Sequence, residues 1–356
     1  MNQQPDLIKK MHKLEPRFKL ILNEIKSNSV KYLAMDKKNA VEILNFIERP
    51  GARLVRANIK NSKKEKIVYI KISKNLRKKS ENFKKSRDKY RKDYETLVKL
   101  NKQLEKYPEY AVLKPVVFYE EYPALVTLES AGVNFHDLLL QELPFWKRNT
   151  NTEKLSNYAL NCGKWLRVFQ QTSQYDSNKT VKLEDLKNYI DIRLTQMIEE
   201  KRKVFPFTLR EKILNYYDKF AELFDEKPMP EVWVHGDYCP VNVLVSENST
   251  VVLDFPMIRK GPIWQDVARF YTQLENLKYK KIYPAKTIKK LQNSFLQGYN
   301  ENLNADNKQF KLLILQHIIT HLRGLTKYRE KKLHSRVFSR WICSRHIEEI
   351  KKITGE

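Results

Sequence analysis

Glycine and cysteine are scarce in this chain, with 8 and 3 of them among 356 residues. So few glycines exclude collagen-like repeats and glycine-rich linkers. The three cysteines, Cys162, Cys239 and Cys343, stand far apart. They therefore predict neither a disulfide framework nor a paired metal site, and they fit a reducing cytosol. No apolar run approaches the roughly 18 residues of a membrane-spanning helix. The first residues lack the apolar segment of a secretory signal, so we expect a cytoplasmic protein.

Positive charge is abundant: 68 Lys and Arg against 42 Asp and Glu give a formal net charge of +26. Residues 1–120 carry a net +17, residues 321–356 a net +6, and the 200 residues between them only +3. The basic segment 71–95 lacks the interleaved aromatic residues of single-strand binders, which argues against nucleic acid as the partner. Two interpretations of the basic ends stay open, a solvated surface or contact with an anionic partner, either a membrane surface or an acidic glycan.

The hydrophobic pattern predicts an α+β protein without internal repeats. Strands are expected over residues 53–59, 67–72, 116–119 and 124–128 and within 232–255. Helices are expected over residues 5–27 and 37–48, in the charged stretch up to about 106, over most of 132–225 and from about 264 onward. A β-rich first part is thus followed by a helical part with a small β insert.

The segment 232–268 places polar side chains at the ends of short apolar strands. His235, Asp237 and Asn242 fall in one loop, and Asp254 ends the next apolar strand. Each of these residues alone would most often be a turn or a cap, but their joint spacing favours a site. Two carboxylates and an amide oxygen are hard ligands that suit Mg²⁺.

These residues resemble the aminoglycoside phosphotransferase and choline kinase group of the protein-kinase-like superfamily. The shared features are H-G-D-x-x-x-x-N at 235–242, L-D-F at 253–255 and G-x-x-x-x-D-x-A at 261–268. The resemblance covers roughly residues 50–330 and is most specific in these motifs. It implies a bilobal protein-kinase-like fold with a small β-rich N-lobe and a larger, mainly helical C-lobe. The expected domains are an N-terminal helical extension over 1–48, the N-lobe over 49–131 and the C-lobe over 132–356.

The resemblance also implies phosphoryl transfer from Mg·ATP to a hydroxyl group. Asp237 would accept or orient the proton of the acceptor hydroxyl. Asn242 and Asp254 would hold Mg²⁺ against the nucleotide phosphates. His235 and Asp266 would support the loop rather than take part in the chemistry.

Upstream of these motifs, Lys71 resembles the strand lysine that contacts the α- and β-phosphates. Glu95 resembles its helix-borne ion-pair partner, with Asp88 and Asp93 as near competitors. No glycine-rich phosphate loop precedes Lys71, because Gly51 is the one glycine in that part of the sequence. The P-loop class is therefore excluded, and the position of the loop that covers the phosphates stays open.

Other segments resemble the same family more loosely. Glu129 and Ala131 belong to a segment that resembles the hinge that receives adenine. Residues 163–166 resemble the helix that supports the catalytic loop, and residues 295–299 resemble a further helix common in these enzymes. His317 and His321 stand four residues apart on a predicted apolar helix, which favours core packing over metal binding.

The sequence defines the reaction better than it defines the acceptor. The near-neutral segment 121–320, where the acceptor pocket is expected, argues against a polycationic aminoglycoside. A sugar, glycan or lipid-linked hydroxyl is favoured instead. ATP and GTP stay open as donors. The alternative function is that of a catalytically silent kinase-like protein that binds a nucleotide or an anionic partner.

Overall fold

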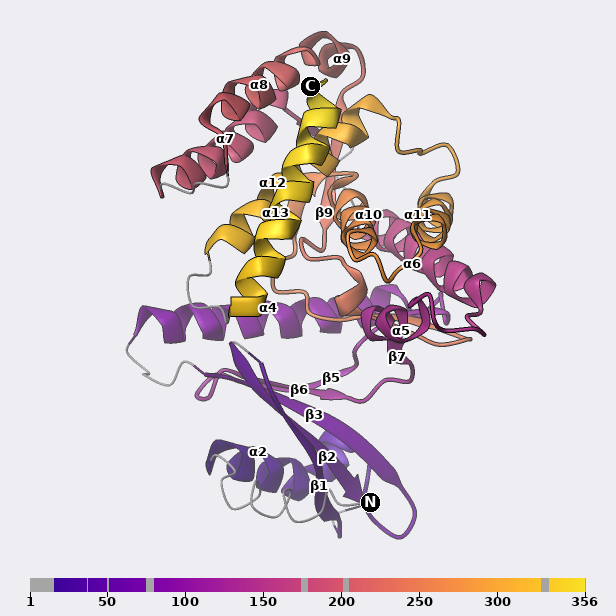
Figure 1. Cartoon of the computed structure of the whole chain (residues 1–356). Helices are drawn as coiled ribbons and strands as arrows, with labels where there is room; N and C mark the ends of the chain where they lie inside the picture. Colours follow the sequence, from indigo (N-terminus) through magenta and orange to yellow (C-terminus); the bar gives the residue numbers. More distant parts are fainter. Residues whose placement is uncertain are drawn as a thin grey trace. The chain divides into compact units, whose positions relative to one another are not determined.

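The computed structural model describes residues 16–36, 38–49, 51–74, 80–173, 179–200, 205–327 and 333–355. The chain divides into two compact units, whose helices and strands are labelled in Figure 1. Unit 1 consists of residues 1–132 and 246–256, and unit 2 of residues 133–245 and 257–356.

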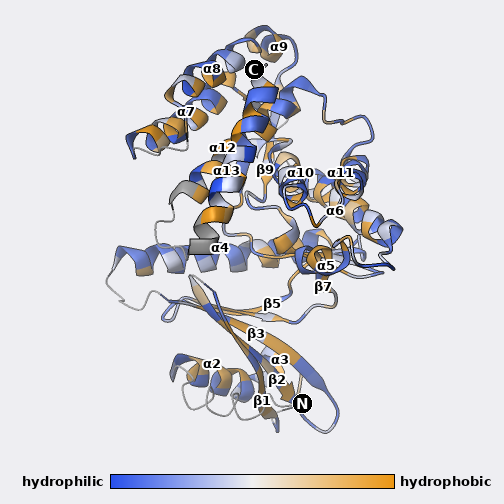
Figure 2. Ribbon diagram, viewed as in Figure 1, coloured by the Kyte–Doolittle hydropathy of each residue, from blue (hydrophilic) through white to orange (hydrophobic). Residues whose placement is uncertain are grey.

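Unit 1 is built around a five-stranded antiparallel sheet with the strand order β1-β2-β3-β6-β5. The strands are β1 (Ala40–Glu48), β2 (Ala52–Lys60), β3 (Glu65–Ser73), β5 (Pro115–Tyr119) and β6 (Ala124–Leu128). They confirm the strands predicted at 53–59, 67–72, 116–119 and 124–128. Their side chains are largely hydrophobic (Figure 2). A short parallel pair, β4 (Tyr110–Val112) and β11 (Thr250–Val252), joins the two chain segments of this unit.

Helices cover both faces of the sheet (Figure 1). On one face, α2 (Pro16–Ser27) and α3 (Ser29–Leu33) share a hydrophobic core with β2, β3 and β6. On the other face lies α4 (Glu81–Gln103). Because side chains alternate across a strand, Ile70 and Ile72 face α2 whereas Lys71 faces α4. Residues 5–15 of the helix predicted over 5–27 lie outside the described residues.

Residues 37–48 were expected to form a helix, and this prediction is wrong. Residues 40–48 form the edge strand β1, which pairs with β2 along its whole length. The register shifts between Ile43 and Asn45, a bulge that inserts one extra residue into the strand. Because the bulge interrupts the two-residue alternation, the apolar residues on either side of it mimic helical spacing. Residues 40–48 therefore belong to the sheet.

Unit 2 is mainly helical, as predicted. Its helices are α5 (Phe135–Glu142), α6 (Thr152–Thr172), α7 (Leu183–Glu199), α8 (Phe207–Asp218), α9 (Ala221–Glu226), α10 (Gln265–Lys278), α11 (Ala285–Tyr299), α12 (Lys308–Lys327) and α13 (Leu333–Thr354). Its short strands are β7 (Val133–Asn134), β8 (Thr180–Val181), β9 (Met229–Val234), β10 (Val243–Val245) and β12 (Arg259–Pro262), and Pro240–Asn242 form a 3₁₀ turn. The α+β class is confirmed. No helix within the described ranges is long and apolar enough to cross a membrane.

Helices α6 and α11 cross with their backbones in contact, because each has a glycine at the crossing. A Cβ atom on Gly163 would lie 2.1 Å from the carbonyl oxygen of Phe295. A Cβ atom on Gly298 would lie 2.0 Å from the carbonyl oxygen of Leu160. Real Cβ contacts are never this short, so both positions require glycine. The crossing fixes α6, which supports the loop described next.

Candidate active site

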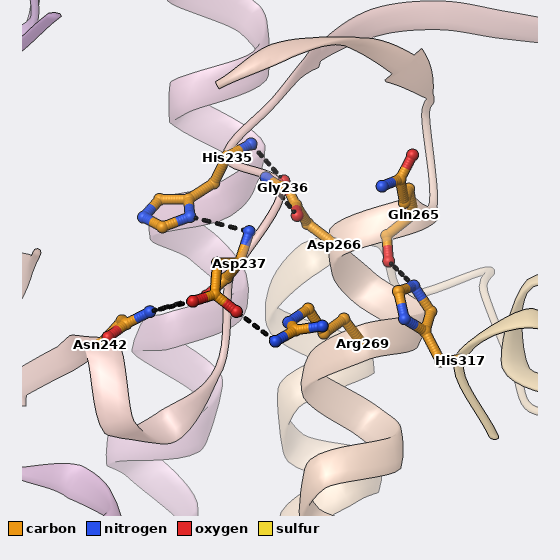
Figure 3. A network of polar contacts seen from close by, with 8 residues as sticks. All are labelled: His235, Gly236, Asp237, Asn242, Gln265, Asp266, Arg269 and His317. Carbon is orange, nitrogen blue, oxygen red and sulfur yellow. Dashed lines mark hydrogen bonds and ion pairs between the residues drawn. The ribbon is translucent and has the colours of Figure 1, made fainter. Parts of the chain in front are cut away.

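The carboxylate of Asp266 on α10 binds the backbone of the loop that follows β9 (Figure 3). Asp266 accepts hydrogen bonds from the backbone N–H groups of His235, at 2.5 Å, and Gly236, at 3.0 Å. Asp266 is fully buried, and burial raises the pKa of its carboxyl group. Gly236 has φ +79°, and a Cβ atom there would lie 2.5 Å from the carbonyl oxygen of Met257. His235 and Asp266 thus stand where loop support was predicted, and the sharp turn at Gly236 presents the next residue.

That next residue is Asp237, whose carboxylate is partly exposed and held by neighbouring side chains (Figure 3). The amide NH₂ of Asn242 donates to Asp237 Oδ2, at 3.2 Å, and to the Asp237 carbonyl oxygen, at 2.9 Å. The backbone N–H of Asp237 donates to His235 Nδ1, at 3.2 Å. Because Asn242 donates through its NH₂, its Oδ1 keeps the acceptor character that a Mg²⁺ ion requires.

Helix α6 supports this loop through stacked aromatic rings. Trp165 is fully buried and its ring lies 5.6 Å from that of Tyr238, nearly parallel to it. The Tyr238 hydroxyl donates to the carbonyl oxygen of Cys162, at 2.8 Å. Residues 163–166 therefore occupy the supporting place that the resemblance implied. Cys239, also in the loop, is buried, and burial raises the pKa of its thiol to about 11, which makes it unreactive at neutral pH.

Arg269 is a site residue that the sequence analysis missed. Its guanidinium forms an ion pair with the carboxylate of Asp237 (Figure 3). Arg269 stands three residues after Asp266 on α10, so the two side chains lie on the same face of the helix. That three-residue spacing is the sequence signal from which Arg269 could have been predicted.

Lys71 and Asp254 lie together in unit 1, with Lys71 Nζ 2.7 Å from Asp254 Oδ1. Burial opposes the charge of Lys71, but the carboxylates of Asp254 and Asp93 outweigh it, so the pKa of Lys71 is raised. Asp254 has φ +67°, a left-handed conformation that is strained for a residue with a side chain. Such strain is concentrated at functional sites, which fits the role predicted for this residue.

Glu95 does not lie where its predicted role requires. It stands on the exposed side of α4, and its side chain has no contact with Lys71 among the interactions of the described residues. Asp93 is instead buried, with 4% exposure, and accepts a hydrogen bond from the backbone N–H of Phe255, at 2.9 Å. The acidic residue of α4 that acts on Lys71 is therefore Asp93.

Glu129 and Ala131 line a pocket of about 510 Å³ beside the beginning of β3. The backbone N–H of Glu129 donates to the carbonyl oxygen of Ile67, at 2.8 Å, which ties the hinge segment to the sheet. The Glu129 carboxylate is held by Arg56 through two bonds, of 2.7 and 3.0 Å. The Glu129 side chain is thus paired with β2 of the sheet.

The two histidines of α12 contact neighbouring elements. His317 is buried and its Nε2 lies 2.8 Å from the carbonyl oxygen of Gln265. His321 Nδ1 lies 2.7 Å from His346 Nε2 on α13. Within the part of the chain that the structure describes, no three His, Cys, Asp or Glu side chains are grouped to hold a metal ion.

Comparison with known proteins agrees with these observations. The model of the "Phosphotransferase enzyme family" matches residues 146–300, which run from just before α6 to the end of α11. No curated protein sequence matches the chain.

Solved structures resemble the chain over almost its whole length. The choline kinase of Cryptosporidium parvum Iowa II has a TM-score of 0.56 and 11% identity, over 94% of this chain and 96% of its own. The GDP complex of aminoglycoside 2'-phosphotransferase-IIIa has a TM-score of 0.53 and 13% identity, over 94% and 98%. A glucosamine kinase has a TM-score of 0.52 and 11% identity, over 91% and 97%.

At these identities the structural likeness establishes the fold, and the family match covers α10 and the loop at residues 235–242, called the HGD loop below. The resemblance that the motifs indicated is thereby confirmed. Residues 146–300 match the phosphotransferase enzyme family, and the chain has the fold of the choline kinase and the aminoglycoside phosphotransferase to which it is similar.

Proposed function

We propose that the protein transfers the γ-phosphoryl group of Mg·ATP to a hydroxyl of a small molecule, sugar, glycan or lipid-linked glycan. The observation that carries this proposal is the HGD loop, in which Asp266 holds the backbone before Asp237 and Asn242 binds the partly exposed Asp237 carboxylate. A carboxylate fixed in this way can take up the proton of an attacking hydroxyl. The family match over the same region supports a phosphotransferase.

In the proposed reaction a bond forms between the acceptor oxygen and the γ-phosphorus, and the bond from that phosphorus to the β–γ bridging oxygen breaks. ADP leaves, and the acceptor proton passes to Asp237 and then to solvent. Bound Mg²⁺ would neutralise the phosphate charge, and the oxygens of Asn242 and Asp254 fit it as ligands. Lys71, kept cationic by Asp254 and Asp93, would bind the nucleotide phosphates.

The nucleotide base is proposed to lie against the backbone of the hinge at Glu129 and Ala131. Structural neighbours among the aminoglycoside phosphotransferases were solved with GDP, so GTP is a second candidate donor. Competition between ATP and GTP in one reaction, read from the ratio of labelled products, decides which nucleotide the hinge prefers.

An acceptor panel tests the proposed function. Wild-type protein, Mg·ATP and hydroxyl compounds of several classes are incubated, and products are read by mass spectrometry for an added phosphate. Asp237→Asn should abolish transfer, by more than about 100-fold, and leave ATP binding intact. If no acceptor is phosphorylated and ATP still binds, the protein is the silent nucleotide-binding alternative.

A peripheral membrane contact is a further part of the proposal, together with a cytoplasmic location. Exposed lysines at 85, 89, 92, 99 and 102 follow one another along α4. A row of lysines of this kind is attracted to anionic lipid, and the attraction weakens as salt is added. Equal co-sedimentation with anionic and neutral vesicles at low salt would rule the contact out.

A further inference from the structure

Two arginines of unit 2 lie at the HGD loop, and a third, from another helix, lies within electrostatic range of one of them. Arg193 comes from α7, Arg259 from β12 and Arg269 from α10. All three lie within electrostatic range of the buried imidazole of His317. Burial and these arginines lower the pKa of His317 to about 3, so the imidazole is neutral and adds no charge of its own.

The three guanidinium groups are only partly neutralised. Arg269 is paired with Asp237, but its Nε is buried and has no hydrogen-bond partner. Arg193 lies over the ring of Tyr189, with its Cζ 3.3 Å from the ring centroid, and donates to the Tyr189 carbonyl oxygen. In the described part of the chain, neither Arg193 nor Arg259 forms an ion pair with a carboxylate. Among the described residues, these two half-buried positive charges therefore have no carboxylate as counterion.

Other arginines of the same unit show how such charges are usually balanced. Arg210 on α8 is bound by both oxygens of Asp191, at 2.7 and 2.8 Å. Arg323 on α12 is bound by both oxygens of Glu200. Half-buried like charges without a carboxylate cost free energy unless an anion binds to them. Guanidinium groups bind phosphate and carboxylate in two-bond geometry, which makes these the expected anions.

Arg259 also lies close to the proposed reaction. Arg259 Nη1 is 2.9 Å from the position of a Cβ atom on Gly236, the residue before Asp237. A molecule whose hydroxyl meets Asp237 would therefore have its neighbouring groups within reach of Arg259.

We propose that the acceptor carries an anionic group, a phosphate or a carboxylate, next to the hydroxyl that is phosphorylated, and that Arg193 and Arg259 bind that group. This inference rests on the proposed phosphotransferase function and names its substrate class. It differs from what the structural neighbours act on by name, choline and glucosamine, which carry amino or ammonium groups. Specificity for an anion follows because a cationic acceptor would meet uncompensated positive charge.

Matched acceptors that differ in one charged group test the proposal. The pairs are glucose with glucose 6-phosphate and glucose with glucuronate, with choline and kanamycin as cationic acceptors. We expect kcat/KM to be at least about 10-fold higher for the anionic member of a pair, since charge-assisted hydrogen bonds supply that much discrimination. A preference for neutral or cationic acceptors would overturn the anionic class and leave the phosphotransferase function standing.

Charge-removing variants locate the anion. Arg193→Gln and Arg259→Gln should each raise KM for the anionic acceptor about 10-fold or more and leave KM for ATP within about twofold. Arg210→Gln is the matched control. It removes a half-buried arginine of the same unit whose charge is already paired with Asp191. If the two variants raise KM for ATP instead, the arginines bind nucleotide phosphate and the proposal is wrong.

A binding experiment keeps the site testable without turnover. Inorganic phosphate is titrated into wild type, the Arg193→Gln/Arg259→Gln double variant and the Arg210→Gln control, with binding read by calorimetry and by thermal shift. Wild type and the control should bind, and the double variant should lose at least about 10-fold in affinity. Equal binding by all three proteins would overturn the arginine site. If no acceptor is phosphorylated yet this difference appears, the phosphotransferase function fails while the anion site stands.

Discussion

Asp93 and Phe255 are joined by a hydrogen bond of 2.9 Å, from the backbone N–H of Phe255 to Asp93 Oδ1. Phe255 directly follows Asp254, whose left-handed backbone needs support from its surroundings. Helix α4 therefore holds the proposed metal ligand and, through the charge of Asp93, also acts on Lys71.

Replacing Asp93 should damage stability and turnover together. Asp93→Ala leaves a buried N–H unpaired, which should lower the free energy of unfolding by about 1–3 kcal/mol. It should also lower kcat by about 10-fold or more as Asp254 loses its support. Asp93→Asn keeps an acceptor and should cost less stability than the alanine variant. Urea denaturation and steady-state kinetics measure both effects. Glu95→Gln, on the exposed side of the same helix, should change neither the stability nor kcat. If it lowers both as much as Asp93→Ala does, the assignment of Asp93 is wrong.

The crossing of α6 and α11 should not tolerate a single added methyl group. Gly163→Ala places a Cβ atom against the backbone oxygen of Phe295, so the helices must move apart. We expect a loss of about 2–3 kcal/mol in the free energy of unfolding, as for other overpacked sites. Gly324→Ala is the control, because the space around that α12 glycine is empty and alanine favours the helix by roughly 1 kcal/mol. A Gly163 variant as stable as wild type would show that the close crossing is absent.

Two buried histidines should make the fold sensitive to acid. In the folded protein burial lowers the pKa of His317 and of His346 from 6.5 to about 3, the latter with help from His321. In the unfolded chain both take up a proton near pH 6.5, so below that pH the unfolded state binds more protons. Stability should therefore fall as the pH drops from about 6.5 toward 3, by about 1.4 kcal/mol per pH unit and histidine.

Urea midpoints at pH 7.5, 6.5 and 5.5 measure this slope. His346→Gln should remove its share of the slope, about half of what the two histidines contribute together. Identical pH profiles for wild type and variant would contradict the assignment.

The hinge ion pair should matter for the nucleotide more than for stability. Arg56 and Glu129 are each about 30% exposed, and pairs of this kind contribute roughly 0–1 kcal/mol. Arg56→Gln releases the Glu129 side chain and loosens the hinge. We expect KM for ATP to rise about three- to tenfold with kcat nearly unchanged, because the hinge is proposed to bind the base. A fall in kcat at unchanged KM would place Arg56 in the chemistry instead.

Sequence spacing located the HGD loop and its partners, but it could not choose between acidic residues two positions apart. Glu95 and Asp93 fit the distance from Lys71 equally well. Helical phase decides between them, because Tyr90, Asp93 and Leu97 are buried at intervals of three and four residues. Phase is readable from the sequence once the apolar residues of a charged helix are aligned, so Asp93 could have been predicted.

Other features depended on pairing between distant segments. The bulge in β1 is defined by its register against β2, and no local pattern records which residue is left over. The ion pair of Arg269 with Asp237 joins a helix to a loop 32 residues away. Local pattern thus predicted most elements and the motif residues, whereas register and side-chain partners required the folded chain.

The two-segment composition of unit 1 has a consequence for how the chain is made. Strand β4 pairs in parallel with β11, and Lys71 pairs with Asp254. This unit therefore combines two segments that are separated by residues 133–245 in the sequence. During synthesis, residues 16–132 emerge long before residues 246–256 can join them. Lys71, the proposed phosphate-binding residue, therefore cannot pair with Asp254 until most of the polypeptide has left the ribosome. A fragment that ends at Gly132 would lack both β11 and Asp254, and an isolated N-terminal piece would be an incomplete folding unit.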